Sequence, residues 1–184
     1  MERLKRTIFN NELWHCTTAI FRYIPRALVT KRVDGMQFYT PEKYNEFKAR
    51  IEQMKSDAPR QWGTMGPAQM LHHLNLAVGG ALGYYELPDE SYWVARTFFK
   101  WILIDWFSEQ PVGLRLPLNF VIRLTDQFDF ETEKKQLLAI LDKACHTQNA
   151  EGYGPHCLFG KLTLNEWGKL SVIHIDYHLK QFAG

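Results

Sequence analysis

Cysteine is scarce in this sequence, and its scarcity excludes a disulfide-stapled fold. The 184 residues contain three cysteines, an odd number spread far along the chain: Cys16, Cys145 and Cys157. Small secreted domains that depend on disulfides carry cysteines at higher density and usually in even number. The pattern instead suits a reducing compartment, and we expect a cytoplasmic protein.

Long apolar runs and blocks of like charge are also missing. The most apolar later stretch, residues 101–104, is closed by Lys100 and Asp105, whereas a bilayer span needs roughly 20 apolar residues. The first six residues are basic, but polar residues interrupt the apolar stretch behind them, so no signal peptide is expected. The 22 basic and 20 acidic residues nearly cancel. The sequence therefore predicts neither a membrane span nor a nucleic-acid partner.

Apolar residues are plentiful enough for one core. A chain of 184 residues with 46% hydrophobic content fits a single compact domain. The turn-favouring dipeptide Asp34-Gly35 divides it into an aromatic and basic extension, residues 1–35, and a main domain, residues 36–184. The extension could touch a membrane through a basic amphipathic face. We expect it instead to pack on the domain through aromatic side chains, namely Trp14, Phe21 and Tyr23.

Apolar residues recur at helical spacing in five stretches of the main domain. Pro41 and Pro67 stand where a first helical turn tolerates proline, and Thr163 with Glu166 forms a capping-box pattern. No stretch alternates as a strand would. The pattern predicts an all-α fold, a four-helix bundle with extra helix or loop decoration, whose helices span 41–57, 67–84, 90–107, 130–146 and 163–182, with a loop over 109–119.

Two histidines mark the last predicted helix. His174 and His178 stand one turn apart on a single face, close enough to bind one metal ion. Spacing alone equally fits surface histidines or a pair satisfied by hydrogen bonds. The pair is therefore a candidate half-site that needs a third ligand.

The second predicted helix carries a His72-His73 doublet among apolar neighbours. An imidazole buried there without a partner would cost desolvation energy, so at least one of the two needs a partner. On a helix, Ala77 and Gly80 share the face of His73, and Leu76 and Gly79 share the face of His72. Periodicity leaves both histidines open, and the glycines equally permit close helix packing.

Several segments together resemble a known superfamily. The matching segments are Trp62-Gly63-Thr64-Met65, Gln69-Met70-Leu71-His72-His73-Leu74, Phe159-Gly160-Lys161-Leu162-Thr163 with Glu166-Trp167, and His174-Ile175-Asp176-Tyr177-His178-Leu179-Lys180-Gln181-Phe182. They look like the DinB-like, or YfiT-like, superfamily of metalloenzymes, and more narrowly like one of its branches described as a domain of unknown function. The resemblance covers about residues 36–184.

The resemblance implies a metal site in a four-helix bundle. Its histidine in the second helix directly precedes the Leu74 position, which selects His73 over His72, and the last helix supplies the His-x-x-x-His pair. Carried over, the ligands are His73, His174 and His178. The sequence departs from the branch at Tyr177, where another histidine is usual, and at Cys157, where proline is usual. We keep both as further site candidates, with ordinary packing as the alternative.

Three imidazole ligands would leave coordination positions open, which suits catalysis better than a closed structural site. Zinc is the first expectation, with nickel, iron and manganese as alternatives. Gln181, on nearly the same face as His174, is expected to support a ligand or a bound water. No carboxylate at helical spacing offers a general base.

The resemblance further implies a metal-dependent transferase or hydrolase acting on a small molecule, among them S-transferases that use a low-molecular-weight thiol. The alternative is a non-catalytic metal-binding or small-ligand-binding bundle. The aromatic content of 14% also allows a homodimer, although buried aromatic residues explain it equally well.

Overall fold

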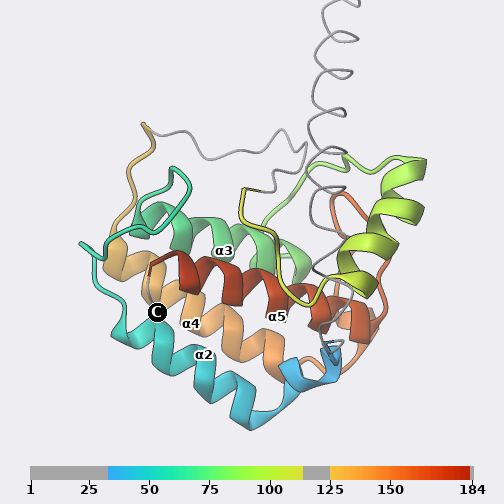
Figure 1. The fold of residues 1–184 in the computed structure, drawn as a ribbon. Helices are drawn as coiled ribbons and strands as arrows, with labels where there is room; N and C mark the ends of the chain where they lie inside the picture. Colours follow the sequence, from blue (N-terminus) through green and yellow to red (C-terminus); the bar gives the residue numbers. More distant parts are fainter. Residues whose placement is uncertain (1–32, 114–124, 183–184) are drawn as a thin grey trace, which may run out of the picture.

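The computed structural model describes residues 33–113 and 125–182, and the regular elements among them are helices joined by turns and loops (Figure 1). The only extended pairing among them is an isolated bridge between His156 and Gly160. The all-α prediction is therefore confirmed for the described residues. In chain order the elements are η1 (Gly35–Tyr39), α2 (Pro41–Gln53), α3 (Pro67–Ala81), η2 (Ala95–Phe99), η3 (Trp101–Trp106), α4 (Phe130–His146), η4 (Ala150–Gly152) and α5 (Leu164–Gln181).

The helices begin where capping residues satisfy the first backbone N–H groups. Asp129 caps α4 by accepting a hydrogen bond from the backbone N–H of Thr132 at 2.8 Å. At the start of α5, the hydroxyl of Thr163 accepts from the backbone N–H of Glu166 at 3.2 Å. The Glu166 carboxylate in turn accepts from the backbone N–H of Thr163 at 2.7 Å. The predicted capping box is thus formed.

Two helices end earlier than the periodicity predicts. The predicted helix 67–84 stops at Ala81, because Gly83 adopts a φ of +78° and closes a Schellman motif, in which Tyr84 N–H donates to the carbonyl of Gly79 at 2.9 Å. The predicted helix 41–57 stops at Gln53. There the ammonium group of Lys134, from α4, donates to the carbonyl of Glu52 at 2.7 Å and to that of the capping residue Met54 at 3.0 Å.

The segment predicted as a helix over 90–107 is helical in part, but with π-helical turns in place of a regular α-helix. Residues 95–106 form π-helical turns, and Phe107 N–H donates to the carbonyl of Ile102, five residues earlier. The predicted loop then begins, and its residues 109–113 are not helical, whereas 114–119 lie outside the described residues. Most of the predicted extension, including Trp14, Phe21 and Tyr23, also lies outside them.

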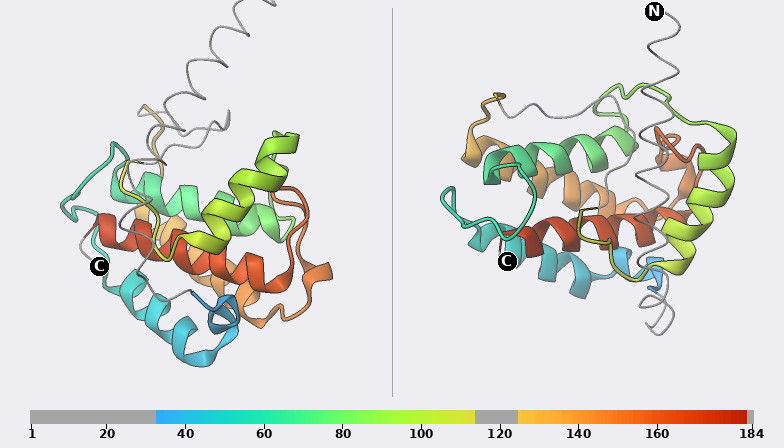
Figure 2. Two further views of the ribbon diagram at one scale, coloured as in Figure 1. Left: turned by 45° about the vertical axis from the view of Figure 1, so that its right-hand side comes forward. Right: turned by 45° about the horizontal axis from the view of Figure 1, so that its top comes forward.

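Four α-helices surround one core. α3 packs against α4 and α5, and α2 packs against the same two helices from the other side, as Figure 1 and both views of Figure 2 show. Each helix contributes fully buried apolar side chains, among them Phe47, Ile51, Leu71, Leu74, Leu137, Leu141, Ile175 and Leu179. This arrangement places the middle of α3 beside the second half of α5. None of the described helices is long and apolar enough to cross a bilayer.

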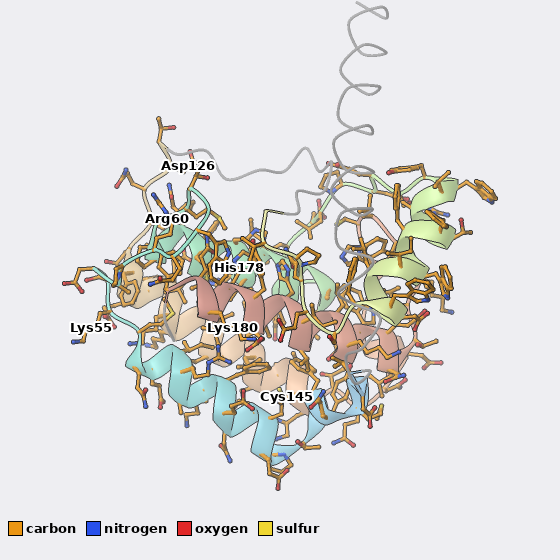
Figure 3. All side chains as sticks on the ribbon, in the orientation of Figure 1. Lys55, Arg60, Asp126, Cys145, His178 and Lys180 are labelled. Carbon is orange, nitrogen blue, oxygen red and sulfur yellow. The ribbon has the colours of Figure 1, made fainter. Side chains whose placement is uncertain are left out.

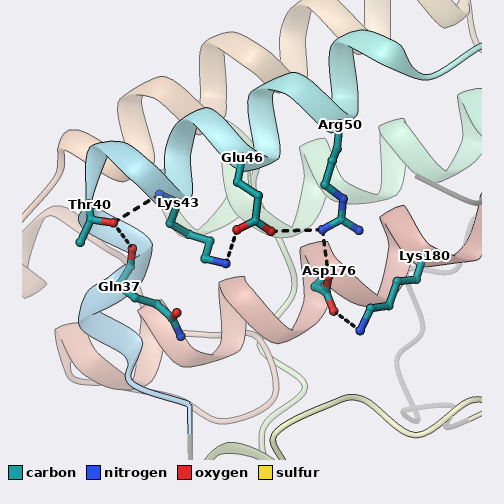
Figure 4. A network of polar contacts seen from close by, with 7 residues as sticks. All are labelled: Gln37, Thr40, Lys43, Glu46, Arg50, Asp176 and Lys180. Atoms are coloured by element: carbon teal, nitrogen blue, oxygen red, sulfur yellow. Dashed lines mark hydrogen bonds and ion pairs between the residues drawn. The ribbon is translucent and has the colours of Figure 1, made fainter.

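An ionic network joins α2 to the outer side of α5 (Figure 4). Asp176 contacts the guanidinium of Arg50 at 2.9 Å and the ammonium of Lys180 at 2.8 Å. Asp176 and Lys180, one helical turn apart on α5, thus form an ion pair, with Arg50 as a second cation. The network keeps the carboxylate of Asp176 on the side of α5 that faces α2.

Candidate metal centre

Three histidines meet where α3 lies beside α5. His73 comes from α3, and His174 and His178 come from α5. One ring nitrogen of each lies within 4.8 Å of the others, and Nε2 of His73 is 3.0 Å from Nε2 of His174. His178 is 4% exposed, and Figure 3 shows it between the two helices. The structure thus brings together the three residues that the sequence singled out.

Helix geometry explains how α5 supplies two of these rings. Residues four apart lie one above the other on a helix face. The rings of His174 and His178 accordingly contact each other edge to face, with centroids 4.7 Å apart. The ring of His73 lies 4.8 Å from that of His178 and 5.1 Å from that of His174. Each ring therefore contacts both of the others.

The neighbouring histidine on α3 faces a different helix. Nδ1 of His72 lies 3.1 Å from Oε1 of Glu133 on α4, and the ring stacks on Phe128 with centroids 3.9 Å apart. Asn75, one turn further, donates to Oε2 of Glu133 at 2.6 Å. A step of one residue turns a helix by about 100°. Periodicity alone left both histidines open, and the structure separates them by the helix that each one faces.

Burial keeps the three clustered imidazoles neutral. Desolvation, followed by the neighbouring imidazoles, lowers the pKa of His73 to about 3 and that of His174 well below its usual value. Desolvation also lowers the pKa of His178 to about 4, although its hydrogen bond to Gln181 acts in the opposite direction. Neutral imidazole is the form that binds metal, because its free nitrogen carries a lone pair.

A side-chain amide holds each ring on α5 from behind. Oε1 of Gln110 accepts from Nδ1 of His174 at 3.1 Å, and Oε1 of Gln181 accepts from Nδ1 of His178 at 3.0 Å. The amide nitrogen of Gln181 donates to the carbonyl of Trp62 at 2.7 Å, which fixes the direction of the amide. Both rings therefore carry their proton on Nδ1, and the lone pair of Nε2 is available to a metal.

Sequence reasoning found one of these two amides. Gln181 follows His174 at helical spacing and was expected to support the site, although it holds His178 and not His174. Gln110 lies in the segment after η3, where no periodic pattern assigns it a direction. Only the folding of this segment back onto α5 reveals its role, and no signal in a single sequence could have shown it.

Comparison with known proteins identifies the family. A family profile described as "Protein of unknown function (DUF1569)" matches residues 36–184. The chain belongs to the DUF1569 family. Membership of a family of unknown function was predicted, over the same residues. No curated protein and no solved structure matches the chain.

The Trp-Gly motif of this DUF1569 chain supports the end of α5. The carbonyl of Trp62 accepts from the side chain of Gln181. The N–H of the preceding residue, Gln61, donates to the backbone carbonyl of Gln181 at 2.8 Å. Gly63 has a φ of +80°, and a Cβ atom there would lie 2.4 Å from Nε2 of Gln181. Glycine is needed here for both its conformation and its small size. The motif thus positions the amide that orients His178.

The other two predicted candidates take less direct positions in the DUF1569 chain. The ring of Tyr177 packs between Trp62 and His178, with centroids 5.5 and 5.0 Å away. Sγ of Cys157 lies 4.0 Å from Nδ1 of His156. Burial and then Glu90 raise the pKa of the Cys157 thiol to about 11, which disfavours a reactive thiolate. Within the described residues, neither cysteine nor carboxylate joins the three-histidine cluster.

Proposed function

We propose that this DUF1569 protein is a metal-dependent enzyme that binds one divalent transition metal ion through His73, His174 and His178. The proposal includes a DinB-like four-helix bundle over residues 36–184. The observation that carries it is the convergence of three neutral imidazoles from two helices, with His178 buried and His73 and His174 partly buried. Burying three such polar rings together without a ligand would leave hydrogen-bonding capacity unused.

The donor set suits such an ion. Imidazole nitrogens bind zinc at roughly 2.0–2.1 Å, so two ligands at about 90 to 109° to each other lie about 2.8–3.4 Å apart. The separation of 3.0 Å between His73 and His174 falls in this range. Three protein ligands leave coordination positions for a substrate. Zinc is the first choice, and nickel, iron and manganese are alternatives, because imidazoles discriminate poorly among them.

The chemistry of the proposed metal site favours a substrate that brings its own nucleophile. A bound divalent ion supplies Lewis acidity, which lowers the pKa of a ligand's proton. A thiol has an ordinary pKa of about 8.5 and needs less such help than water does. Because no carboxylate joins the described cluster as a general base, transfer of a low-molecular-weight thiol ranks ahead of hydrolysis.

Elemental analysis of tag-free protein tests the site. We expect about one equivalent of a transition metal in the wild-type protein and none in the His174→Ala, His178→Ala double variant. His146→Ala is the matched control, since the side chain of His146 is 70% exposed on α4. A wild-type protein that holds no metal, and takes up none of zinc, nickel, iron or manganese on titration, would rule out the proposal.

A non-catalytic binding module is the second candidate. Most general bases in enzymes are histidine or carboxylate groups. The described cluster contains no carboxylate, and its three histidines would hold the metal, which favours the binding module. The two candidates differ in turnover. Metal-loaded protein that binds thiols but transfers none of them to a panel of electrophiles supports the binding module, whereas metal-dependent transfer supports the enzyme.

A further inference from the structure

Two carboxylates on α5 and α4 are held by partners outside the cluster of three histidines. On α5, Asp176 is held by Arg50 and Lys180 on the side facing α2 (Figure 4). Across from α3, Glu133 is held by His72 and Asn75. Within the described residues, no carboxylate joins the cluster of the three histidines.

The groups that do support the ligands are neutral. Metal-binding histidines often donate their second N–H to a carboxylate, which makes the imidazole more basic and offsets part of the metal's charge. Here the acceptors are the amide oxygens of Gln110 and Gln181. An amide fixes the ring as a carboxylate would, but it brings no negative charge.

A divalent ion bound by these three neutral histidines would keep its full charge in a largely buried site. Transfer of an unpaired charge from water into a protein interior costs several kcal/mol or more. Neither the three neutral rings nor the two amides compensate that charge. A small anion at an open coordination position would.

We infer that Gln110 and Gln181 are positioning residues that keep the metal centre uncompensated, so that it takes a small monoanionic ligand, as a substrate thiolate would be. This inference rests on the proposed function and adds the charge of the ligand to it. Gln181 is fixed through Trp62 and Gly63. Gln110 reaches the site from the segment that follows η3.

Replacing an amide by a carboxylate of the same shape tests this directly. Gln110→Glu and Gln181→Glu each retain an acceptor for the Nδ1–H group and add one negative charge. The protein is loaded with Co²⁺, whose visible absorption reports the coordination, and is titrated with azide at pH 8, where the new carboxyl group is ionised. Gln53→Glu, at an exposed position in the last turn of α2, adds the same charge away from the cluster.

We expect azide to change the Co²⁺ spectrum of the wild-type and Gln53→Glu proteins with the same dissociation constant. In Gln110→Glu and Gln181→Glu the azide dissociation constant should rise at least tenfold, while Co²⁺ binds as tightly or more tightly in Gln110→Glu, since Gln181→Glu also loses the donor to the carbonyl of Trp62. Gln110→Ala separates charge from orientation. It should weaken Co²⁺ binding by about 10–100-fold, the usual effect of losing such a partner.

The outcomes separate this inference from the proposed function. A wild-type protein that does not take up Co²⁺ overturns both. A Co²⁺ protein whose spectrum azide leaves unchanged overturns the anion preference alone. Equal azide affinity in the wild-type, Gln110→Glu and Gln181→Glu proteins shows that the two amides do not set the preference, and also overturns the inference.

Discussion

His72 and His73 are neighbours on α3, yet they belong to interfaces of opposite character. Facing α4, His72 meets the carboxylate of Glu133, and Asn75 completes a small polar cluster in which Glu133 bonds both partners. Facing α5, His73 meets two more neutral imidazoles and no carboxylate among the described residues. The first interface pairs its histidine with a carboxylate of the same chain, although Oδ1 of Asn75 is buried there without a hydrogen-bond partner. The second interface gathers lone pairs without an internal partner of opposite charge. Such a contrast distinguishes a structural polar contact from a binding site.

Replacing each of the two histidines by alanine, one at a time, gives the largest expected difference in metal affinity. His73→Ala removes a ligand, and we expect metal affinity to fall by more than about a hundredfold, beyond the 10–100-fold typical of an outer partner. His72→Ala should leave the metal content near one equivalent. Competition with a chromophoric chelator measures both affinities. Equal losses in the two variants would contradict the separation of the two interfaces.

Acid should destabilise the metal-free protein through the three-histidine interface. In the unfolded chain these histidines gain protons near pH 6.5, whereas in the folded chain the pKa is about 3 for His73 and about 4 for His178. Stability is thus fully present above about pH 6.5 and falls as pH decreases toward 4, by at most about 1.4 kcal/mol per pH unit for each histidine.

Urea unfolding of chelator-treated protein at pH 7.5, 6.5, 5.5 and 4.5 measures this slope. Because His174 also has a pKa well below its usual value, His174→Ala should show a shallower loss than the wild-type protein. The exposed control His146→Ala should keep the wild-type slope. A slope that does not change in His174→Ala would mean that this interface does not drive the acid sensitivity.

The two interfaces also show how far a single sequence determines this protein. Periodicity and capping residues located α4 and the start of α5, because those signals are local. The carbonyls at the early end of α2 are bonded by Lys134, 80 residues beyond Met54, and the π-helical turns of residues 95–106 have no local signature that the pattern could reveal. Histidine spacing suggested half of the site. The choice of His73 needed the resemblance to a family, and Gln110 needed the fold.

A change at Glu133 tests the interface between α3 and α4, and it has the smallest expected effect of the changes considered. In Glu133→Gln the amide oxygen can still accept from Asn75, but the negative charge is lost and the amide NH2 group faces Nδ1 of His72, which can accept that bond only as the Nε2–H tautomer. We expect the free energy of unfolding to fall by about 1–3 kcal/mol, measured by urea at pH 7.5, with metal content unchanged. Loss of metal from a protein that remains folded would mean that the carboxylate on α4 supports the site through the backbone of α3. That result would join the two interfaces into one functional unit, because residues 72 and 73 would then depend on the same charge.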